Sequence, residues 1–125
     1  MINKEAKILV VDDMGMIRKS IVKYLSTLGY ENIVEAGNGL EAVDAFKQES
    51  PEIVFMDIVM PEMTGDEALG KMREINSETP IIMLSSVAEK ETIKRCKELG
   101  ASGYILKALT IETGADELNK YLSMF

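Results

Sequence analysis

The sequence predicts an α/β fold, with a doubly wound, five-stranded parallel sheet and helices on both of its faces. Two observations carry this prediction. Short apolar runs alternate strictly along the chain with segments of helical periodicity, and such alternation implies right-handed crossovers between parallel strands. At least four of the five runs are apolar at consecutive positions, which is typical of strands covered on both sides.

Each expected strand is a short apolar run of about strand length. The second run is the weakest, because it is short and half polar. The runs cover residues 6–11, 32–36, 52–56, 80–85 and 103–107.

Apolar residues at intervals of three and four predict five amphipathic helices between and after these strands. Gly100, just past the fourth periodic segment, is a helix stop signal. We expect Gly114 near the start of the last helix, because a glycine inside a helix costs about 1 kcal/mol relative to alanine. The periodic residues are Ile17, Ile21, Leu25 and Leu28; Leu40, Val43 and Phe46; Ala68, Met72 and Ile75; Ile93, Cys96 and Leu99; and Leu118, Tyr121 and Leu122.

The composition predicts one globular domain over residues 1–125 and excludes several functions. The net charge of −7, without a Lys/Arg block, argues against a nucleic-acid surface. No apolar stretch approaches membrane-spanning length, and the N-terminus lacks a signal-peptide pattern, so we expect a cytoplasmic protein without membrane contact. The chain has no histidine, which excludes the usual hydrolase triads, and its single cysteine excludes an internal disulfide.

Asp57 interrupts one of the most apolar parts of the chain, between Ile-Val-Phe-Met and Ile-Val-Met-Pro. A carboxylate in such surroundings must be paired, bound to metal, shifted in pKa, or placed where the strand leaves the core. We expect Asp57 to lie at the strand end without being buried, as a chemical group and not a structural one.

Ligands of open α/β sheets bind outside the carboxyl ends of the strands, so the first polar residues after each run are the candidate site. Clustered carboxylates repel one another, and a hard cation with oxygen ligands, such as Mg²⁺, relieves that repulsion. A neighbouring ammonium and hydroxyl complete surroundings suited to a transferring phosphoryl group, with Asp57 as the nucleophile that accepts it. The candidate residues are Asp12, Asp13, Asp57, Ser85, Ser86 and Lys107.

Each of these residues alone has a simpler structural interpretation. An Asp-Asp pair after a strand is more often a helix N-cap than a metal site, and Asp13 can serve as both. Ser86 is expected to satisfy local backbone groups, Tyr104 to pack in the core, and Lys107 to be a solvated charge. The convergence of four motifs at the correct strand ends favours the chemical interpretation.

The whole chain resembles the receiver domain of bacterial response regulators, in particular the single-domain chemotaxis regulators. The resemblance lies in "ILVVDDMGMIRK", "IVFMDIVMPEMTG", "PIIMLSS" and "GASGYILK", at spacings that match the family. It implies a flavodoxin-like (βα)5 sandwich with strand order 2-1-3-4-5.

The resemblance also implies a role for each acidic residue. Asp57 would accept a phosphoryl group from the phosphohistidine of a histidine kinase. Asp13 and Asp57, with the main-chain carbonyl of Val59, would hold Mg²⁺, while Asp12 would act largely through a bound water. The protein would then be a signalling phosphoacceptor and not an enzyme.

By the same resemblance, phosphorylation switches a partner-binding surface. Ser85 would reach the phosphoryl group, Lys107 would contact one of its oxygens, and Tyr104 would swing inward. The output surface would be formed by the fourth helix, fifth strand and fifth helix, and its targets include a flagellar motor switch component, another kinase or a phosphotransfer protein. We expect a monomer. The surface would carry Tyr104, Lys90, Lys94 and Lys97.

The sequence departs from the family pattern at two places. Lys107 is followed by Ala108 where the family has proline after a cis bond, so either a trans bond with a rearranged loop or a strained cis bond is expected, with trans favoured. Val59 and Val87 lie two residues beyond Asp57 and Ser85, where water would approach the acyl phosphate. Apolar side chains there predict slow self-hydrolysis.

Two other functions remain as alternatives. A Mg²⁺-dependent phosphatase with an Asp nucleophile usually has a second aspartate two residues on, where this chain has Val59. A degenerate receiver, acting as a phosphorylation-independent interaction module, is favoured slightly by the missing proline and opposed more strongly by the intact acidic cluster.

Overall fold

The computed structural model describes residues 2–86 and 90–125, and for residues 107–113 it describes the backbone alone. Ten elements alternate strictly between strand and helix. The strands are β1 (Ile8–Val11), β2 (Ile33–Ala36), β3 (Ile53–Asp57), β4 (Ile81–Ser85) and β5 (Gly103–Leu106). The helices are α1 (Gly15–Thr27), α2 (Gly39–Glu49), α3 (Gly65–Ile75), α4 (Lys90–Glu98) and α5 (Lys107–Met124).

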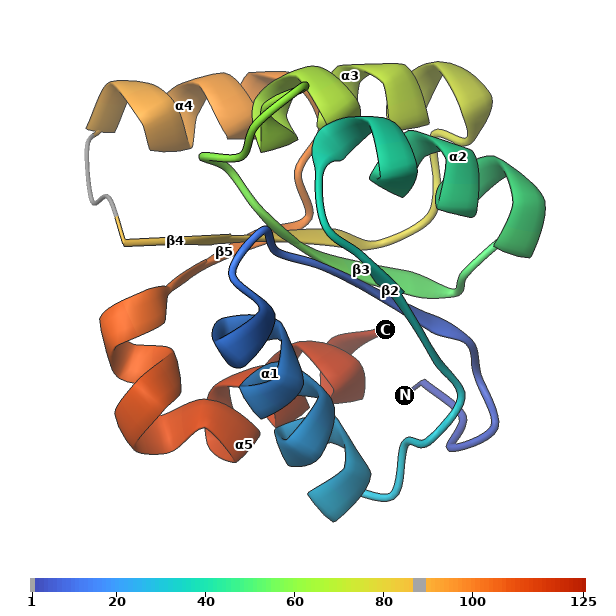
Figure 1. Cartoon of the computed structure of the whole chain (residues 1–125), viewed down its shortest axis with the longest axis vertical. Coiled ribbons are helices and arrows are strands. Elements are labelled where there is room, and N and C mark those ends of the chain that lie inside the picture. Colours follow the sequence, from blue (N-terminus) through green and yellow to red (C-terminus); the bar gives the residue numbers. More distant parts are fainter. Residues whose placement is uncertain (1, 87–89) are drawn as a thin grey trace.

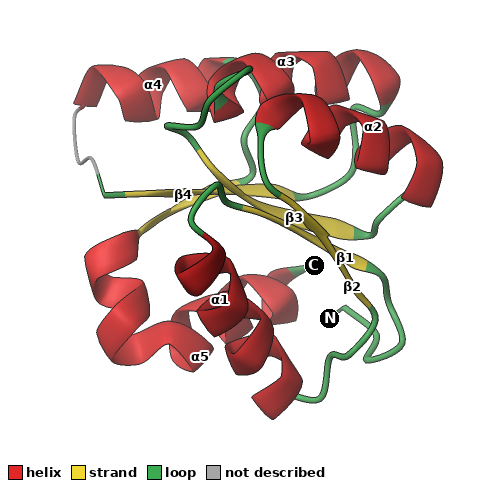
Figure 2. Cartoon of the chain, in the orientation of Figure 1, coloured by secondary structure: helices red, strands yellow, loops and turns green. Residues whose placement is uncertain are grey.

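The strands form one parallel sheet in the order β2-β1-β3-β4-β5. Helices α2, α3 and α4 cover one face of the sheet, and α1 and α5 cover the other (Figure 1). The same three layers are visible when the chain is coloured by secondary structure (Figure 2). The predicted fold class and the strand order 2-1-3-4-5 are confirmed.

The core has two halves, one on each side of the sheet. Successive strand residues point to opposite faces, so Leu9 and Val11 pack toward α2 and α3, whereas Ile8 and Val10 pack toward α1 and α5. The central strands β1, β3 and β4 are buried along their whole length. Strand β2, at the edge, is mostly half-buried, in agreement with its weaker sequence pattern.

Two details of the last βα unit differ from expectation. Strand β5 ends at Leu106, and Lys107 begins α5 instead of ending the strand. Gly114 lies inside α5 and not near its start. The physical reason is a close approach by α1, because a Cβ built on Gly114 would lie 2.4 Å from a ring carbon of Tyr24.

No helix in the described part of the chain is both long enough and apolar enough to cross a membrane.

Candidate functional site

The strand register brings three aspartates together at the carboxyl edge of the sheet. Val11 of β1 pairs with Met56 of β3, so the residue after each, Asp12 and Asp57, extends the sheet side by side. Asp13 follows directly. One carboxylate oxygen from each of the three lies within 4.8 Å of the others. Asp12 and Asp57 are buried and Asp13 is exposed, so the cluster has a buried base and an open side.

The start of α1 tests the capping interpretation of the Asp pair. Met14 occupies the N-cap position of α1, so neither aspartate is the cap. Asp12 nevertheless supports the turn, because its Oδ1 accepts a hydrogen bond from the Met14 N–H at 2.9 Å. The N-cap interpretation of Asp13 is therefore wrong, and Asp13 is the exposed member of the acidic cluster.

Asp57 is more buried than the sequence suggested. It is the last residue of β3 and its exposed fraction is 5%, which contradicts the expectation of an unburied strand end. One oxygen, Oδ1, accepts from the N–H of Ile58 at 2.8 Å. The burial follows from the register, since β4 pairs with Asp57 itself and β1 pairs with β3 up to the residue before it.

The loop from β3 to α3 is packed tightly against the site. The N–H of Gly65 donates to the carbonyl of Ile58 at 2.7 Å, and the N–H of Gly39 donates to the carbonyl of Met63 at 3.1 Å. Glu62 has a positive φ of 67°, in the left-handed region that non-glycine residues rarely adopt. Val59, two residues past Asp57 in this loop, is 67% exposed. The loop is thus anchored at both of its ends while Val59 faces solvent.

The two serines after β4 differ in their surroundings. Ser85 is 1% exposed and pairs in register with Leu106 of β5, whereas Ser86 is exposed. The register therefore brings the end of β5 next to Ser85. Lys107 follows Leu106 directly, but its side chain lies outside the described residues, as does Val87. No cis peptide bond occurs among the described residues, and the helical backbone at Lys107 fits the trans alternative.

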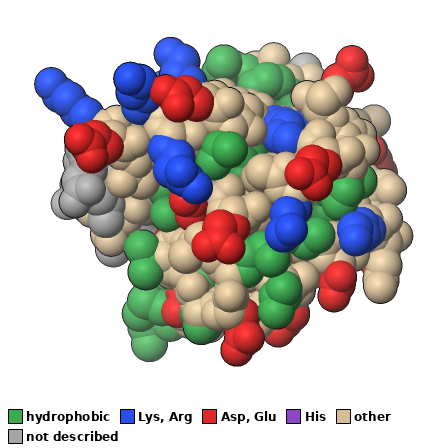
Figure 3. All heavy atoms as spheres, turned by 90° about the horizontal axis from the view of Figure 1, so that it is seen from above, with side chains coloured by type: hydrophobic (Ala, Val, Ile, Leu, Met, Phe, Trp, Pro, Cys, Tyr) green, Lys and Arg blue, Asp and Glu red, His purple; other side chains and the backbone are tan. Residues whose placement is uncertain are grey.

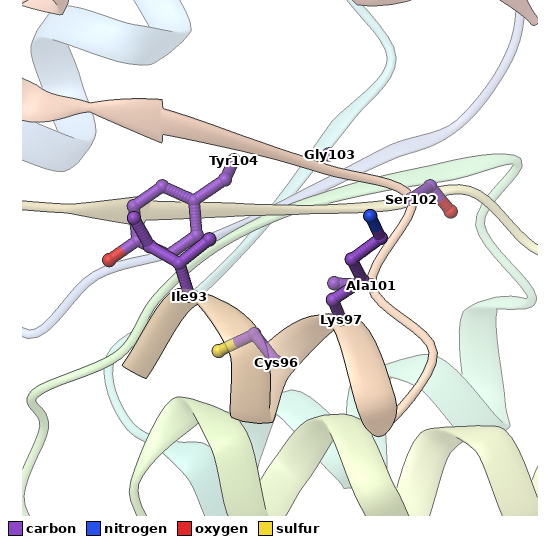
Figure 4. A pocket seen from close by; sticks show the side chains of 7 residues that line it. All are labelled: Ile93, Cys96, Lys97, Ala101, Ser102, Gly103 and Tyr104. Carbon is purple, nitrogen blue, oxygen red and sulfur yellow. The ribbon is translucent and has the colours of Figure 1, made fainter. Parts of the chain in front are cut away.

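Tyr104 lines a small cavity between β5 and α4. Its ring extends toward Ile93 of α4, and the Cys96 thiol lies further along the same helix (Figure 4). The cavity has a volume of about 140 Å³. Tyr104 is half-buried and packs against the core on the α2–α3–α4 side of the sheet. Cys96 is buried, and burial raises the pKa of its thiol, as expected for an unreactive core cysteine.

Helix α4 presents a basic surface next to this cavity. Figure 3 views the α2–α3–α4 side of the molecule from above, and Lys and Arg side chains lie on its left, around α4, with acidic side chains among them. One of them, Arg95, reaches across to the first turn of α3, where its Nε lies 2.8 Å from Oδ2 of Asp66. The exposed basic residues of α4 are Lys90, Lys94, Arg95 and Lys97.

Arg18 belongs to the surroundings of the site and was missed in the sequence. Its Nη1 donates to the main-chain carbonyl of Asp12 at 2.6 Å, and its Nε donates to Oε1 of Glu35 at 2.9 Å. The sequence offered one signal, a basic residue shortly after the Asp pair in "DDMGMIRK". That spacing does not reveal that the side chain folds back toward the strand end.

The donor set of the acidic cluster fits a hard divalent cation. All three side chains supply oxygen, the ligand that Mg²⁺ and Ca²⁺ prefer, and none supplies nitrogen or sulfur. Mg²⁺ commonly takes one or two carboxylates and keeps several waters, which the exposed position of Asp13 allows. Three carboxylates this close also repel one another, so a cation there would relieve the repulsion.

Comparison with known proteins agrees with this geometry. Residues 8–119 match the sequence profile of the response regulator receiver domain. The chain is 36% identical over 117 residues to the chemotaxis protein CheY of Bacillus subtilis, an alignment that covers 94% of this chain and 98% of the relative.

Solved structures of similar sequence share the fold. The chemotaxis protein CheY4 of Vibrio cholerae is 32% identical and has a TM-score of 0.84, with 93% of this chain and 98% of that chain covered. A CheX–CheY–BeF3–Mg²⁺ complex from Borrelia burgdorferi contains a chain that is 31% identical with a TM-score of 0.77, over 81% of this chain and 77% of the other. Receiver domains are the signalling phosphoacceptors of two-component systems. The chain belongs to this family, as a CheY-like response regulator receiver domain.

Proposed function

We propose that this protein accepts a phosphoryl group on Asp57 from the phosphohistidine of a histidine kinase and thereby switches a partner-binding surface. An oxygen of the Asp57 carboxylate forms the new bond to phosphorus while the bond from phosphorus to the donor imidazole nitrogen breaks, and the imidazole takes up one proton from solvent, which leaves an acyl phosphate and a neutral imidazole. The observation that carries the proposal is the group of three carboxylate oxygens within 4.8 Å of one another at the edge of the sheet.

Mg²⁺ is the cofactor that this proposal assigns to the cluster. Asp13 and Asp57 would hold it with the main-chain carbonyl of Val59, and Asp12 would act through a bound water. Bound there, the cation would offset the negative charge of the carboxylates and of the incoming phosphoryl oxygens. The donor set supports this assignment, and the Borrelia burgdorferi complex contains Mg²⁺ together with a similar chain.

Two further side chains are assigned to the phosphoryl group itself. The Ser85 hydroxyl would donate a hydrogen bond to a phosphoryl oxygen, and its position one residue past the strand partner of Asp57 supports this. Lys107 would contribute a positive charge from the neighbouring strand end. Its main chain follows Leu106, the register partner of Ser85.

The output surface would be the α4–β5–α5 face. Tyr104 would move inward when Ser85 is drawn to the phosphoryl group, and the cavity beside its ring supplies room for side-chain rearrangement there. The exposed basic residues of α4 would then meet an acidic partner. The class of target would be a motor switch component, a kinase or a phosphotransfer protein.

The proposal treats residues 1–125 as one receiver domain that acts as a monomeric, cytoplasmic phosphoacceptor and not as an enzyme. The phosphatase alternative lacks its second aspartate, because Val59 stands at that position. The degenerate-receiver alternative keeps one supporting observation, the alanine at position 108.

The test is phosphorylation by a small donor, followed by the intact mass. Acetyl phosphate with Mg²⁺ should add about 80 Da to the wild-type protein, the mass of one phosphoryl group. Asp57→Asn should gain nothing, and omission of Mg²⁺ should greatly slow the wild-type gain. Ser86→Ala is a matched control. Ser86 is exposed and follows Ser85 directly, and the variant should be phosphorylated on Asp57 like the wild type. Unmodified wild-type protein after prolonged exposure would favour the degenerate receiver.

A further inference from the structure

The guanidinium of Arg18 joins three elements around the acidic cluster. It extends from α1, donates to the main-chain carbonyl of Asp12 at the end of β1, and pairs with Glu35 of β2. The first of these hydrogen bonds is 2.6 Å long and the second 2.9 Å. The side chains of Arg18 and Glu35 are 21% and 29% exposed, so the bridge is half-buried at Arg18 and open to solvent at Glu35.

The carbonyl that Arg18 binds belongs to the peptide group that joins Asp12 to Asp13. The orientation of this peptide group sets the directions in which both carboxylates leave the backbone. Its neighbours are already constrained, since the Asp12 N–H donates to the Ala36 carbonyl at 3.2 Å and the Met14 N–H donates to Asp12 Oδ1 at 2.9 Å. The bond from Arg18 adds a charge-assisted contact on the carbonyl, and such bonds are stronger than neutral ones.

A positive charge this close to a cation site would weaken cation binding unless it were balanced. Glu35 supplies that balance. Burial alone would raise the pKa of Glu35, but hydrogen bonds and charge from Arg18 and Lys19 lower it below its ordinary value. Glu35 is therefore ionised at neutral pH and offsets the guanidinium. Glu35 thus offsets the charge of Arg18, while the second cation on the same carboxylate, Lys19, is 69% exposed and therefore screened by water.

We propose that Arg18 is a positioning residue for the divalent cation, acting through the main chain of Asp12 and anchored by Glu35. This inference rests on the proposed function, because it assigns Arg18 to the same metal site. It concerns the geometry of the carboxylates before any phosphoryl donor arrives, so it is testable without phosphorylation.

The test compares Mg²⁺ affinity in Arg18→Gln and in Lys19→Gln. Both substitutions remove one positive charge from a partner of Glu35, but Lys19 contacts only the Glu35 side chain, at 3.1 Å, and not the main chain of Asp12 in the described part of the structure. Loss of a positive charge by itself strengthens cation binding. We expect Arg18→Gln to weaken Mg²⁺ binding by about tenfold, the lower end of the range for groups that orient metal ligands. Lys19→Gln should leave the affinity unchanged or slightly tighter.

Two further variants refine the comparison. Arg18→Lys keeps the charge but replaces a fork of donors with a single ammonium, so its affinity should fall between those of the wild type and Arg18→Gln. Glu35→Gln removes the anchor and the balancing charge, and it should also weaken binding. Affinity is measured by titration of the amide NMR signals of Asp12 and Asp13 with Mg²⁺, and urea unfolding without metal reports stability separately.

The outcomes are distinct. A weaker affinity in the folded Arg18 variants, with Lys19→Gln unaffected, supports the inference. Equal or tighter binding in Arg18→Gln or Arg18→Lys overturns it while the proposed function stands. Wild-type protein that binds no Mg²⁺ overturns both. If Arg18→Gln is unfolded without metal, Arg18→Lys and Glu35→Gln decide the question by the same criteria.

Discussion

Gly65 lies directly against the main-chain carbonyl of Asp57. A Cβ built on Gly65 would be 1.9 Å from that oxygen and 2.8 Å from the Cα of Ile58. The N–H of Gly65 also donates to the Ile58 carbonyl at 2.7 Å. The first residue of α3 therefore packs directly against the main chain of the last residue of β3. A movement of the Asp57 main chain would also move the start of α3.

Gly65→Ala should destabilise the protein and disturb the acidic cluster. The added methyl group meets backbone and not a flexible side chain, so β3 or α3 must move. Overpacking of this kind costs about 1–3 kcal/mol in unfolding free energy. Urea denaturation measures the loss, and the rate of mass gain with acetyl phosphate measures the effect on Asp57.

Gly70→Ala, on the same helix, is the matched control. A Cβ at Gly70 meets nothing closer than 3.9 Å, a carbon of Leu99. A glycine inside a helix makes the helix less stable than an alanine does, by up to about 1 kcal/mol. The Gly70→Ala variant should therefore be as stable as the wild type or more stable. Equal stability in the two variants would contradict the tight approach of Gly65 to Asp57.

Asp66, the residue after Gly65, ties α3 to α4 through its ion pair with Arg95. Burial raises the pKa of Asp66, but hydrogen bonds from Thr64 and Arg95 outweigh it, so the pKa lies below its ordinary value of 3.8. A depressed folded-state pKa contributes stability above the unfolded value, and this is lost as pH falls from about 4 through the folded value. We expect Arg95→Gln to lower the urea midpoint at pH 7 and to differ less from the wild type at pH 3.

Lys94→Gln is the comparison for Arg95→Gln. Lys94 is the neighbouring residue, and its pair with Glu98 is 3.9 Å long with both side chains largely exposed. Exposed pairs contribute little, so this variant should follow the wild type at both pH values. If the urea midpoints of Arg95→Gln and the wild type differed more at pH 3 than at pH 7, the predicted pH dependence of the Asp66–Arg95 pair would be wrong.

Val59 should prolong the life of the acyl phosphate. Val59 is 67% exposed, lies two residues past Asp57 in the sequence, and has no side-chain group that can orient water. Val59→Asn adds an amide that can hold a water molecule in line with the phosphorus, and we expect hydrolysis to be faster by about tenfold, below a full general-base effect. The decay of the phosphorylated mass after removal of the donor gives the rate.

The exposure of Val59 also supplies the control for that experiment. A substitution at an exposed loop position usually changes the unfolding free energy by less than about 0.5 kcal/mol, so the fold should be unaffected. Val59→Leu keeps the apolar character and should retain the slow hydrolysis. Equal lifetimes in Val59→Asn and Val59→Leu would show that another group controls the access of water.

The sequence predicted the sheet and the acidic cluster well because both depend on local pattern. Consecutive apolar residues mark β1, β3 and β4, and parallel strands necessarily bring Asp12 and Asp57 to one edge. The burial of Asp57 was predicted wrongly, because the exposure of a strand end depends on how far the neighbouring strands extend.

Long-range side-chain contacts were less accessible to sequence reasoning. In the sequence, Arg18 is one polar position on an amphipathic helix. Its hydrogen bond to the Asp12 carbonyl depends on how α1 crosses the edge of the sheet. Helix propensity alone predicts that Gly114 lies near the start of a helix, because glycine is unfavourable in a helix interior. Its actual position is decided by Tyr24, a residue far away in the sequence.

The contact between Gly114 and Tyr24 predicts that Gly114→Ala destabilises the protein when Tyr24 is present and stabilises it when the Tyr24 ring is removed. In the wild type, a Cβ at position 114 would lie 2.4 to 2.8 Å from three ring carbons of Tyr24, so Gly114→Ala should destabilise the packing of α5 on α1. In Tyr24→Ala the ring is gone, and the same change should stabilise the protein by up to about 1 kcal/mol through helix propensity. Urea unfolding of all four proteins gives the coupling between the two positions. Stabilisation by Gly114→Ala in the wild type would mean that propensity outweighs the contact, and that the glycine is not required by the approach of the two helices.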